Sequence, residues 1–217
     1  MNEKKGKYIC FCGIDGCGKT TQANLLMKSL YRNFTNVRMV HGIKPYRFSG
    51  ELKEVAIKNR TSFYEMFSDE LRTMSFVLDM VDVSTKIIQP SLEEGNIIIG
   101  EKDFLDTYIY ASLLGTQETY IQFLSKSMIV PDIYFVLDIS AEEAIKRIHS
   151  RHIYEQKEIA PKEDYNIAKK ARKKFLDYGS KHKNCILIDG MQDKQTVHEQ
   201  VMKACYDLLY YEEIVDK

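Results

Sequence analysis

Short apolar runs alternate with helical patterns along the chain. Five runs are predicted to form strands: Tyr8–Cys12, Val37–Val40, Asn96–Gly100, Ile133–Ile139 and Cys185–Ile188. Runs such as Ile97-Ile98-Ile99 have no polar face, which is typical of strands that are buried on both sides. Strands that alternate with helices predict an α/β fold, in which helices cover both faces of a parallel sheet.

Between these runs, apolar residues recur at helical spacing. The predicted helices are Lys19–Tyr31, Ser68–Ile88, Ala141–Ser150 and Lys194–Tyr211. The longest helix carries Leu71, Met74, Leu78 and Val81 on one face, and Pro90 is expected to end it. Ligands of such folds bind at the carboxyl ends of the strands, so functional residues are expected there.

Composition narrows the possible functions. A chain of 217 residues favours one domain, residues 1–217, and its 31 Lys+Arg balance 31 Asp+Glu, which gives no pull toward nucleic acid or membrane. The five cysteines include no CxxC pair, which favours free thiols in a reducing cytoplasm. The polar segment 1–7 precedes an apolar run too short for a signal peptide or a membrane span. We therefore expect a cytoplasmic protein.

Residues 13–20 match the phosphate-binding pattern GxxxxGKS/T in full, between an apolar strand and an amphipathic helix. Gly13, Gly16 and Gly18 allow successive backbone N–H groups to surround phosphates, and the helix start adds its positive dipole end. Lys19 is expected to reach the β- and γ-phosphates of ATP, and the Thr20 hydroxyl to bind Mg²⁺. Thr21 is placed in the same cofactor site. No NKxD-type guanine-reading segment follows, which favours a kinase of small molecules over a GTPase.

The longer stretch Phe11–Gln22 closely resembles the opening of the thymidylate kinases, FxGxDGxGKTTQ. Three further segments resemble family motifs in the same order. Residues 88–95 resemble IxPALExG, residues 131–138 resemble PDxxxxLD, and Ile188-Asp189-Gly190 resembles the last strand and the turn beside adenine. The resemblance extends from about Tyr8 to the end of the chain.

This resemblance implies a three-layer α/β/α P-loop kinase fold with a five-stranded parallel sheet and a mobile lid. The family transfers the γ-phosphoryl group of ATP to dTMP with the help of Mg²⁺. By resemblance, Asp15 lies near the sugar and phosphate of the acceptor, Arg147 lies in the helix that leads into the lid, and Gly190 lies beside adenine. The family usually forms homodimers, and the helix Ser68–Ile88 could supply an apolar interface; the sequence leaves the oligomeric state open.

The lid is expected to supply a catalytic cation. One branch of the family carries arginine directly after the aspartate of the phosphate loop, but here that residue is Gly16. The predicted lid, about residues 149–161, contains Arg151, His152 and Lys157, of which Arg151 is our principal candidate. The alternative for each of these residues is a solvated basic loop.

The end of the third strand departs from the family pattern Asp-Arg-Tyr, in which the carboxylate helps to order Mg²⁺ and the arginine holds phosphate. We interpret Glu101-Lys102 as the replacement, which makes Glu101 the metal ligand. A shifted register would place Lys102-Asp103 there instead. In either register lysine lacks the bidentate geometry of arginine.

The acceptor side of the predicted site departs further from the family pattern. The long helix of the family carries LLFAADR, whose Phe stacks on thymine and whose Arg contacts the base or the phosphate region. Counting back from Pro90 places Phe76 and Asp79 at the Phe and Asp positions, whereas Met80 replaces the arginine. Arg72 lies on the same helix face, and core packing is the alternative for Phe76.

Two loops complete the predicted acceptor site. Residues 41–48 replace the REPGGT segment of the family, so Lys44 and Arg47 are candidates for the missing positive charge. Tyr108 and Tyr110 lie near the position of its Tyr-Gln pair, and we place Tyr108 in the site. The donor side is thus kept while the acceptor side is rewritten.

The expected function is ATP- and Mg²⁺-dependent phosphoryl transfer to dTMP or a similar nucleoside monophosphate. One alternative is the same chemistry on a different small acceptor. The other is a nucleotide-binding regulatory protein without transfer activity.

Overall fold

The computed structural model describes residues 6–116, 118–155 and 164–210. Five parallel strands form one sheet in the order β2-β3-β1-β4-β5. The strands are β1 Lys7–Cys12, β2 Val37–His41, β3 Ile97–Glu101, β4 Ile133–Asp138 and β5 Cys185–Asp189. Central β1 pairs with β3 on one side and β4 on the other. The predicted five-stranded parallel sheet is confirmed, and each bound lies within one residue of its expected place.

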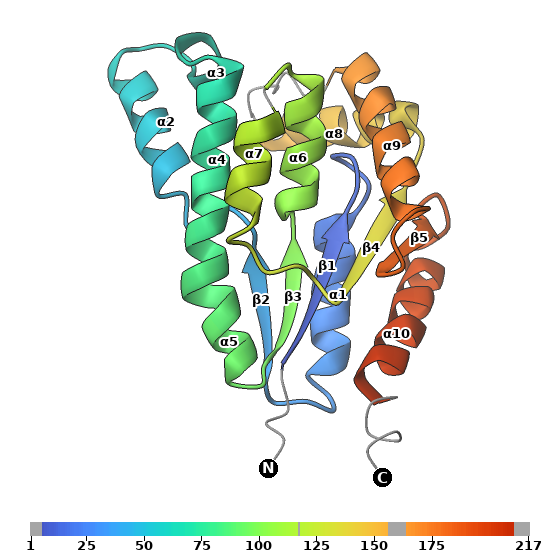
Figure 1. Cartoon of the computed structure of the whole chain (residues 1–217). Coiled ribbons are helices and arrows are strands. Elements are labelled where there is room, and N and C mark those ends of the chain that lie inside the picture. Colours follow the sequence, from blue (N-terminus) through green and yellow to red (C-terminus); the bar gives the residue numbers. More distant parts are fainter. Residues whose placement is uncertain (1–5, 117, 156–163, 211–217) are drawn as a thin grey trace.

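Helices cover both faces of this sheet. They are α1 Lys19–Leu30, α2 Phe48–Lys58, α3 Phe63–Met66, α4 Asp69–Val83, α5 Gln89–Glu93, α6 Phe104–Leu113, α7 Glu118–Ser125, α8 Ala141–Glu155, α9 Tyr165–Gly179 and α10 Lys194–Tyr210. Helices α1 and α10 pack against each other on one face, and α4, α6 and α9 form the layer on the other (Figure 1). In the described part of the chain, no helix combines the length and apolarity needed to cross a bilayer.

The long predicted helix does not end at Pro90. A π-helical turn, η1 (Ser84–Ile88), joins α4 to α5, and Pro90 lies in the first turn of α5. Proline lacks an N–H group and its ring clashes with the carbonyl four residues earlier in a regular helix. The wider π turn relieves this conflict, so one helical rod continues from Asp69 to Glu93. The first half of that rod carries Arg72, Phe76 and Asp79 of the predicted acceptor residues.

All strand carboxyl ends meet at one edge of the sheet because the strands are parallel. This edge lies at the top of Figure 1, where α2, α3 and the start of α4 stand on one side and α8 and α9 on the other. The phosphate loop follows β1 there, Lys102 follows β3 and Gly190 follows β5. On α9, Arg172 donates two hydrogen bonds, of 2.6 and 2.9 Å, to the carboxylate of Asp138 at the end of β4. That pair fixes α9 beside the functional edge.

Candidate active site

The phosphate loop connects β1 to α1 through a backbone that requires glycine. Gly18, the N-cap residue immediately before α1, has φ of 102°, and no side chain caps this helix end. At Gly16, a Cβ atom would lie 2.6 Å from the carbonyl oxygen of Ala144 on α8. The first turn of α1 contains no acidic residue. Its unsatisfied N–H groups and its dipole therefore favour a bound phosphate.

Lys19 is buried within this loop, with 5% of its surface exposed. Its ammonium donates hydrogen bonds to the carbonyl oxygens of Gly13 (2.6 Å) and Ile14 (3.1 Å). It also lies 3.6 Å from Asp15 and 3.4 Å from Asp106. Burial pulls the pKa of Lys19 down, but the surrounding negative groups outweigh it and hold that pKa well above its usual range. The lysine is therefore charged at neutral pH.

Asp15 joins two lysines at the floor of the site. Lys102 adopts φ of 55°, an uncommon value for a residue other than glycine, and its ammonium lies 3.3 Å from Asp15. The backbone N–H of Asp15 donates to the hydroxyl of Tyr110 at 3.2 Å. The structure thus brings together Asp15, Lys19 and Lys102, three of the predicted site residues. It adds Tyr110 rather than Tyr108 to the group.

Asp106 belongs to the same cluster, although the sequence argument did not select it. It lies in the first turn of α6, with 5% of its surface exposed, and neither carboxylate oxygen accepts a hydrogen bond from the described residues. Burial raises the pKa of Asp106, and the charge of Lys19 opposes this rise. Lys102 precedes α6 and does not share a helix with Asp106, so no helical spacing indicated this residue.

The two candidate carboxylates after β3 have different surroundings. Glu101 is the last residue of the strand and pairs with Phe11 and His41 of the neighbouring strands. One of its oxygens lies 3.7 Å from His41, and the other is buried without a hydrogen-bond partner among the described residues.

Asp103 makes contacts that stabilise the fold. Its carboxylate caps α6 by accepting the N–H of Leu105 at 3.0 Å, and it accepts the hydroxyl of Tyr134 at 2.7 Å. Burial raises the pKa of Asp103 to about 7. Its oxygens are thus committed to structural contacts, in contrast to those of Glu101.

The residues expected to hold Mg²⁺ fit that ion. Magnesium prefers oxygen ligands and keeps several waters, so one carboxylate and one hydroxyl suffice from the protein. Glu101 offers the buried oxygen that lacks a partner, and Thr20 is exposed at the start of α1. When bound, the ion would neutralise charge on the phosphate oxygens.

A cavity of about 210 Å³ opens beside the carboxylate cluster. Asp15, Lys102 and Asp106 line one end, and Phe76 and Met80 of α4 line another part of its wall. The ring of Phe76 packs edge-on against Phe63 at 5.9 Å. A flat aromatic wall next to a charged floor suits an acceptor with a planar base and a polar sugar.

Arg72 lines this cavity, but other groups hold its guanidinium. It donates to the carbonyl oxygens of Tyr64, at 2.7 Å, and Phe67, and it forms an ion pair with Asp69. Its exposed fraction is 7%. Arg72 therefore shapes the wall between α3 and α4, with its charge balanced by Asp69.

Lys53 of α2 brings a cation to the cavity that the sequence argument missed. Its ammonium lies 4.4 Å from the ring centre of Tyr46, 5.5 Å from that of Phe63 and 5.6 Å from that of Phe76. Cations are attracted to aromatic faces at such distances. Helix α2 was not predicted from the sequence, so the position of Lys53 near Phe76 could not be predicted either.

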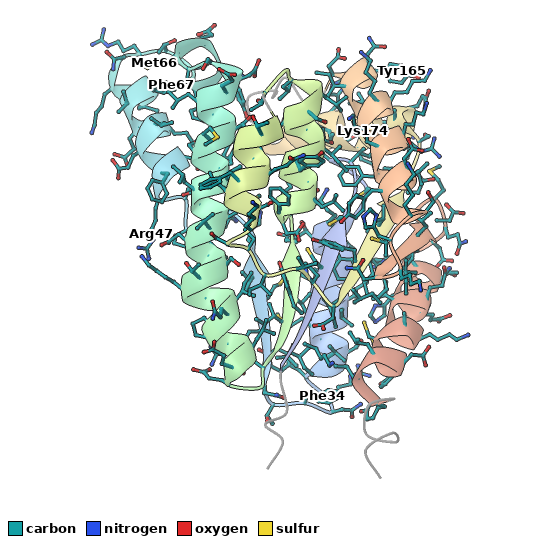
Figure 2. The ribbon with its side chains drawn as sticks, in the orientation of Figure 1. Phe34, Arg47, Met66, Phe67, Tyr165 and Lys174 are labelled. Atoms are coloured by element: carbon teal, nitrogen blue, oxygen red, sulfur yellow. The ribbon has the colours of Figure 1, made fainter. Side chains whose placement is uncertain are left out.

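Two predicted acceptor residues support α2 instead of lining the cavity. Asp79 is fully buried and accepts hydrogen bonds from the N–H of Phe48 at 2.7 Å and from the N–H and hydroxyl of Ser49 at 3.2 and 2.5 Å. Arg47 forms an ion pair with Asp82 at 3.0 Å, and its side chain lies on the outside of the molecule beside α4 (Figure 2).

The remaining acceptor candidates also lie elsewhere. Tyr108 packs against Phe104 on α6, with ring centres 5.8 Å apart, and does not line the cavity. Lys44 lines a separate hollow, together with His41, Tyr46 and Glu101. The cavity therefore receives Arg72 and Phe76 from the predicted acceptor set, besides Asp15.

The residues predicted for the lid, the adenine side and the cofactor site have these contacts. Arg147 of α8 pairs with Glu143 at 2.8 Å, and the N–H of Gly190 donates to the carbonyl oxygen of Asp138 at 2.7 Å. Thr21 is exposed on α1. Helix α8 continues to Glu155, so part of the predicted lid is helical, while the Arg151 side chain and residues 156–161 lie outside the described structure.

Comparison with known proteins identifies the relatives of this arrangement. The sequence profile described as thymidylate kinase matches residues 11–201. A thymidylate kinase from Caldanaerobacter subterraneus subsp. tengcongensis is 29% identical over 213 residues, covering 94% of this chain and 97% of the relative. A probable thymidylate kinase from Thermococcus kodakarensis is 26% identical over 205 residues, covering 93% and 98%.

A solved structure shares the fold. The crystal structure of thymidylate kinase from Ehrlichia chaffeensis superposes with a TM-score of 0.68 at 24% identity, covering 93% of this chain and 98% of that one. This likeness supports the three-layer P-loop architecture. Because the family profile spans most of the sequence, the chain belongs to the thymidylate kinase family.

Proposed function

We propose that the protein transfers the γ-phosphoryl group of ATP to dTMP or a similar nucleoside monophosphate in the presence of Mg²⁺. The observation that carries this proposal is the position of Lys19. Its ammonium is charged and lies between the phosphate loop and the carboxylate floor of a base-sized cavity. A cation at that point can act on the group that moves from donor to acceptor.

On the donor side, the chain binds and orients phosphate. The N–H groups of the loop and the start of α1 hold the phosphate oxygens, with Thr20 and Glu101 as the residues that would hold Mg²⁺. Lys19 exchanges its contacts with the carbonyls of Gly13 and Ile14 for phosphate oxygens. Since an acceptor phosphate is already ionised and needs no general base to remove a proton, positioning and charge stabilisation dominate the catalysis.

On the acceptor side, Phe76 supplies the stacking face for the base. Asp15 accepts a hydroxyl of the sugar, and Lys102 faces the acceptor phosphate. The geometry favours the Glu101-Lys102 register, because Asp103 is committed to capping α6 and to Tyr134. Lys53 supplies the positive charge that Met80 cannot. Arg147 and Arg151 remain the proposed lid cations.

A different small acceptor stays a second candidate because Met80 replaces the arginine of the family and the loop 41–48 is rewritten. A regulatory nucleotide-binding protein is disfavoured, since a protein that only binds nucleotide needs no carboxylate like Glu101 at the strand end. The homodimer stays a prediction from the resemblance, and the cytoplasmic location stays a prediction from the sequence composition.

The test is ATP turnover in a coupled assay with dTMP, dUMP, other nucleoside monophosphates and non-nucleotide acceptors. Phosphorylation of at least one nucleoside monophosphate supports the proposal. Turnover only with non-nucleotide acceptors favours the second candidate. ATP binding without transfer to any acceptor would contradict both.

A further inference from the structure

Glu101 ends β3 beside a histidine that ends β2. The two residues are in register in the sheet, and the Nε2 atom of His41 lies 3.7 Å from the Oε1 atom of Glu101. Both side chains are largely buried, with 15% of the His41 side chain and 10% of the Glu101 side chain exposed. The other carboxylate oxygen, Oε2, is buried without a hydrogen-bond partner among the described residues. The carboxylate thus has one oxygen beside the histidine and one oxygen available for a ligand.

The backbone holds these two strand ends together. The N–H of Gly42 donates to the carbonyl oxygen of Glu101 at 3.1 Å, which continues the pairing of β2 with β3 past His41. A Cβ atom at residue 42 would collide with the carbonyl oxygen of Lys102, so this close approach requires glycine. The ring of His41 packs edge-on against Tyr46, with ring centres 6.3 Å apart. Backbone pairing and an aromatic contact therefore both fix His41 beside Glu101.

The Glu101 side chain lies on the face of the sheet that α1 covers. Gly100 is in register with Cys10, and Cys10 with Tyr134, whose ring contacts α9 on the opposite face. Successive side chains of a strand point to opposite faces, so Glu101 points away from α9 and toward the side of α1. Helix α1 begins directly after the phosphate loop, with Thr20 in its first turn. The carboxylate and the hydroxyl proposed to hold Mg²⁺ therefore share one side of the sheet.

A glutamate ligand benefits from a neighbour that orients it. The side chain of Glu101 has several rotatable bonds, and their freedom is lost when the carboxylate is held against a metal ion. A group that holds one carboxylate oxygen in advance lowers this cost, because the ligand is then preorganised. His41 is placed to do so, since its ring nitrogen lies next to Oε1 in a largely buried pair.

We propose that His41 is a positioning residue for the metal-binding carboxylate. Its Nε2–H donates a hydrogen bond to Oε1 of Glu101, which leaves Oε2 to hold Mg²⁺ together with the Thr20 hydroxyl. The separation of 3.7 Å closes to hydrogen-bond length by a small shift of either side chain. Removing a group that orients a metal ligand in this way costs about 10–100-fold in metal affinity. This inference rests on the proposed function, because it assigns a support to the proposed metal ligand.

The experiment measures how strongly Mg²⁺ promotes ATP binding in the absence of an acceptor. Calorimetric titration of ATP into the protein, once with excess Mg²⁺ and once with excess EDTA, gives two dissociation constants. Their ratio is the coupling between metal and nucleotide. In His41→Ala we expect this ratio to fall about tenfold relative to the wild type. His41→Gln, whose amide N–H can still donate to Glu101, should lose less than about threefold.

A Glu101→Gln background separates positioning from a structural role. If His41 acts through the carboxylate, His41→Ala should change the ratio by less than about twofold once Glu101 is already replaced. General damage to the phosphate loop weakens ATP binding in both Mg²⁺ and EDTA, so it cancels in the ratio. Lys44→Ala is the matched control, because it removes a cation from the same hollow, where the ammonium lies 5.9 Å from the ring centre of Tyr46. It should leave the ratio within about twofold of the wild type.

Binding and transfer distinguish this inference from the proposed function. A ratio within about twofold of the wild type in a folded His41→Ala variant would overturn the inference, as would an equal fall in the Glu101→Gln background. A wild-type ratio of one would also overturn it, because ATP binding would then show no coupling to Mg²⁺ for His41 to support. In each of these cases, transfer to a nucleoside monophosphate would leave the proposed function standing. Failure to bind ATP in either condition would refute both.

Discussion

The donor loop and the acceptor cavity are built in different ways. The loop is a local structure: Lys19 reaches the carbonyls of residues five and six positions earlier, and Gly16 and Gly18 set the backbone. The cavity is assembled from the phosphate loop, the segment 43–46 and helices α2, α4 and α6, which are far apart in the sequence. Local geometry tolerates little change, whereas an assembled wall can exchange one contributor for another.

The location of positive charge illustrates that exchange. The helix position at which the family carries arginine is Met80 here, with 4% of its surface exposed on the cavity wall. A cation enters the same cavity from α2, as Lys53. The family motif on α4 thus lacks its arginine, while the folded chain places another cation, Lys53, at the same cavity.

The largest effect is expected at the donor loop. Lys19→Ala removes the cation at the transferring group and should lower kcat by about 10²–10³-fold or more, as expected for loss of a key charge-stabilising group. Single-turnover transfer measured with the best acceptor checks this, with circular dichroism as the control for folding. Near-normal turnover in a folded variant would sink the kinase function.

The second-largest effect is expected at Glu101, and it distinguishes the two possible registers of the segment after β3. Glu101→Gln should lower kcat about a hundredfold and raise the Mg²⁺ concentration needed for half-maximal rate, since it removes the charge of the proposed metal ligand. Asp103→Asn should change kcat only a few-fold, because the amide oxygen can still accept the Leu105 N–H while the amide N–H donates to the Tyr134 hydroxyl oxygen. Magnesium titrations of both variants distinguish the two registers. A larger loss of kcat in Asp103→Asn than in Glu101→Gln would favour the Lys102-Asp103 register.

The contrast between a local loop and an assembled cavity also explains which parts of the structure could be predicted from the sequence. Strands such as Ile133–Asp138 are continuous apolar runs, and their bounds were predicted within a residue. The position of the phosphate loop between a strand and a helix was predicted because its motif lies within eight consecutive residues. The effect of Pro90 was predicted wrongly, because a π turn accommodates the proline where a regular helix could not.

The cavity was predicted only in part, for physical reasons. Phe76 and Arg72 lie on a strongly periodic helix and were found. Helix α2 begins at hydrogen bonds from its first residues to Asp79, a partner thirty residues away, so no local pattern indicated the helix or Lys53. The same contact removed Asp79 from the acceptor set. Asp106 was missed because the register of its segment was open.

A smaller effect is expected at Lys53. Lys53→Met keeps most of the length of the side chain but removes the charge near Tyr46 and Phe76. The KM of the monophosphate acceptor should therefore rise about tenfold, the scale of a cation contact worth about 1–2 kcal/mol. The KM of ATP should change little, because Lys53 lies on the acceptor side. Kinetics with each substrate varied in turn provide the measurement. An equal rise in both KM values would show that Lys53 supports the fold rather than the acceptor.

The smallest effect is expected at Arg47, which the sequence proposed as a substitute for the missing arginine. Its side chain is 55% exposed and pairs with Asp82, a surface contact of the kind that contributes about 0–1 kcal/mol. Arg47→Ala should therefore leave the acceptor KM within about twofold and change the free energy of unfolding by less than about 1 kcal/mol. Urea denaturation and acceptor kinetics on this variant, with Lys53→Met measured alongside, provide the test. The two variants change one positive charge each, on either side of the start of α2, but only Lys53 lines the cavity. A tenfold rise in the acceptor KM of Arg47→Ala would mean that the loop before α2 turns Arg47 inward when the acceptor binds, and that the positive charge lies in the loop after β2 rather than on α2.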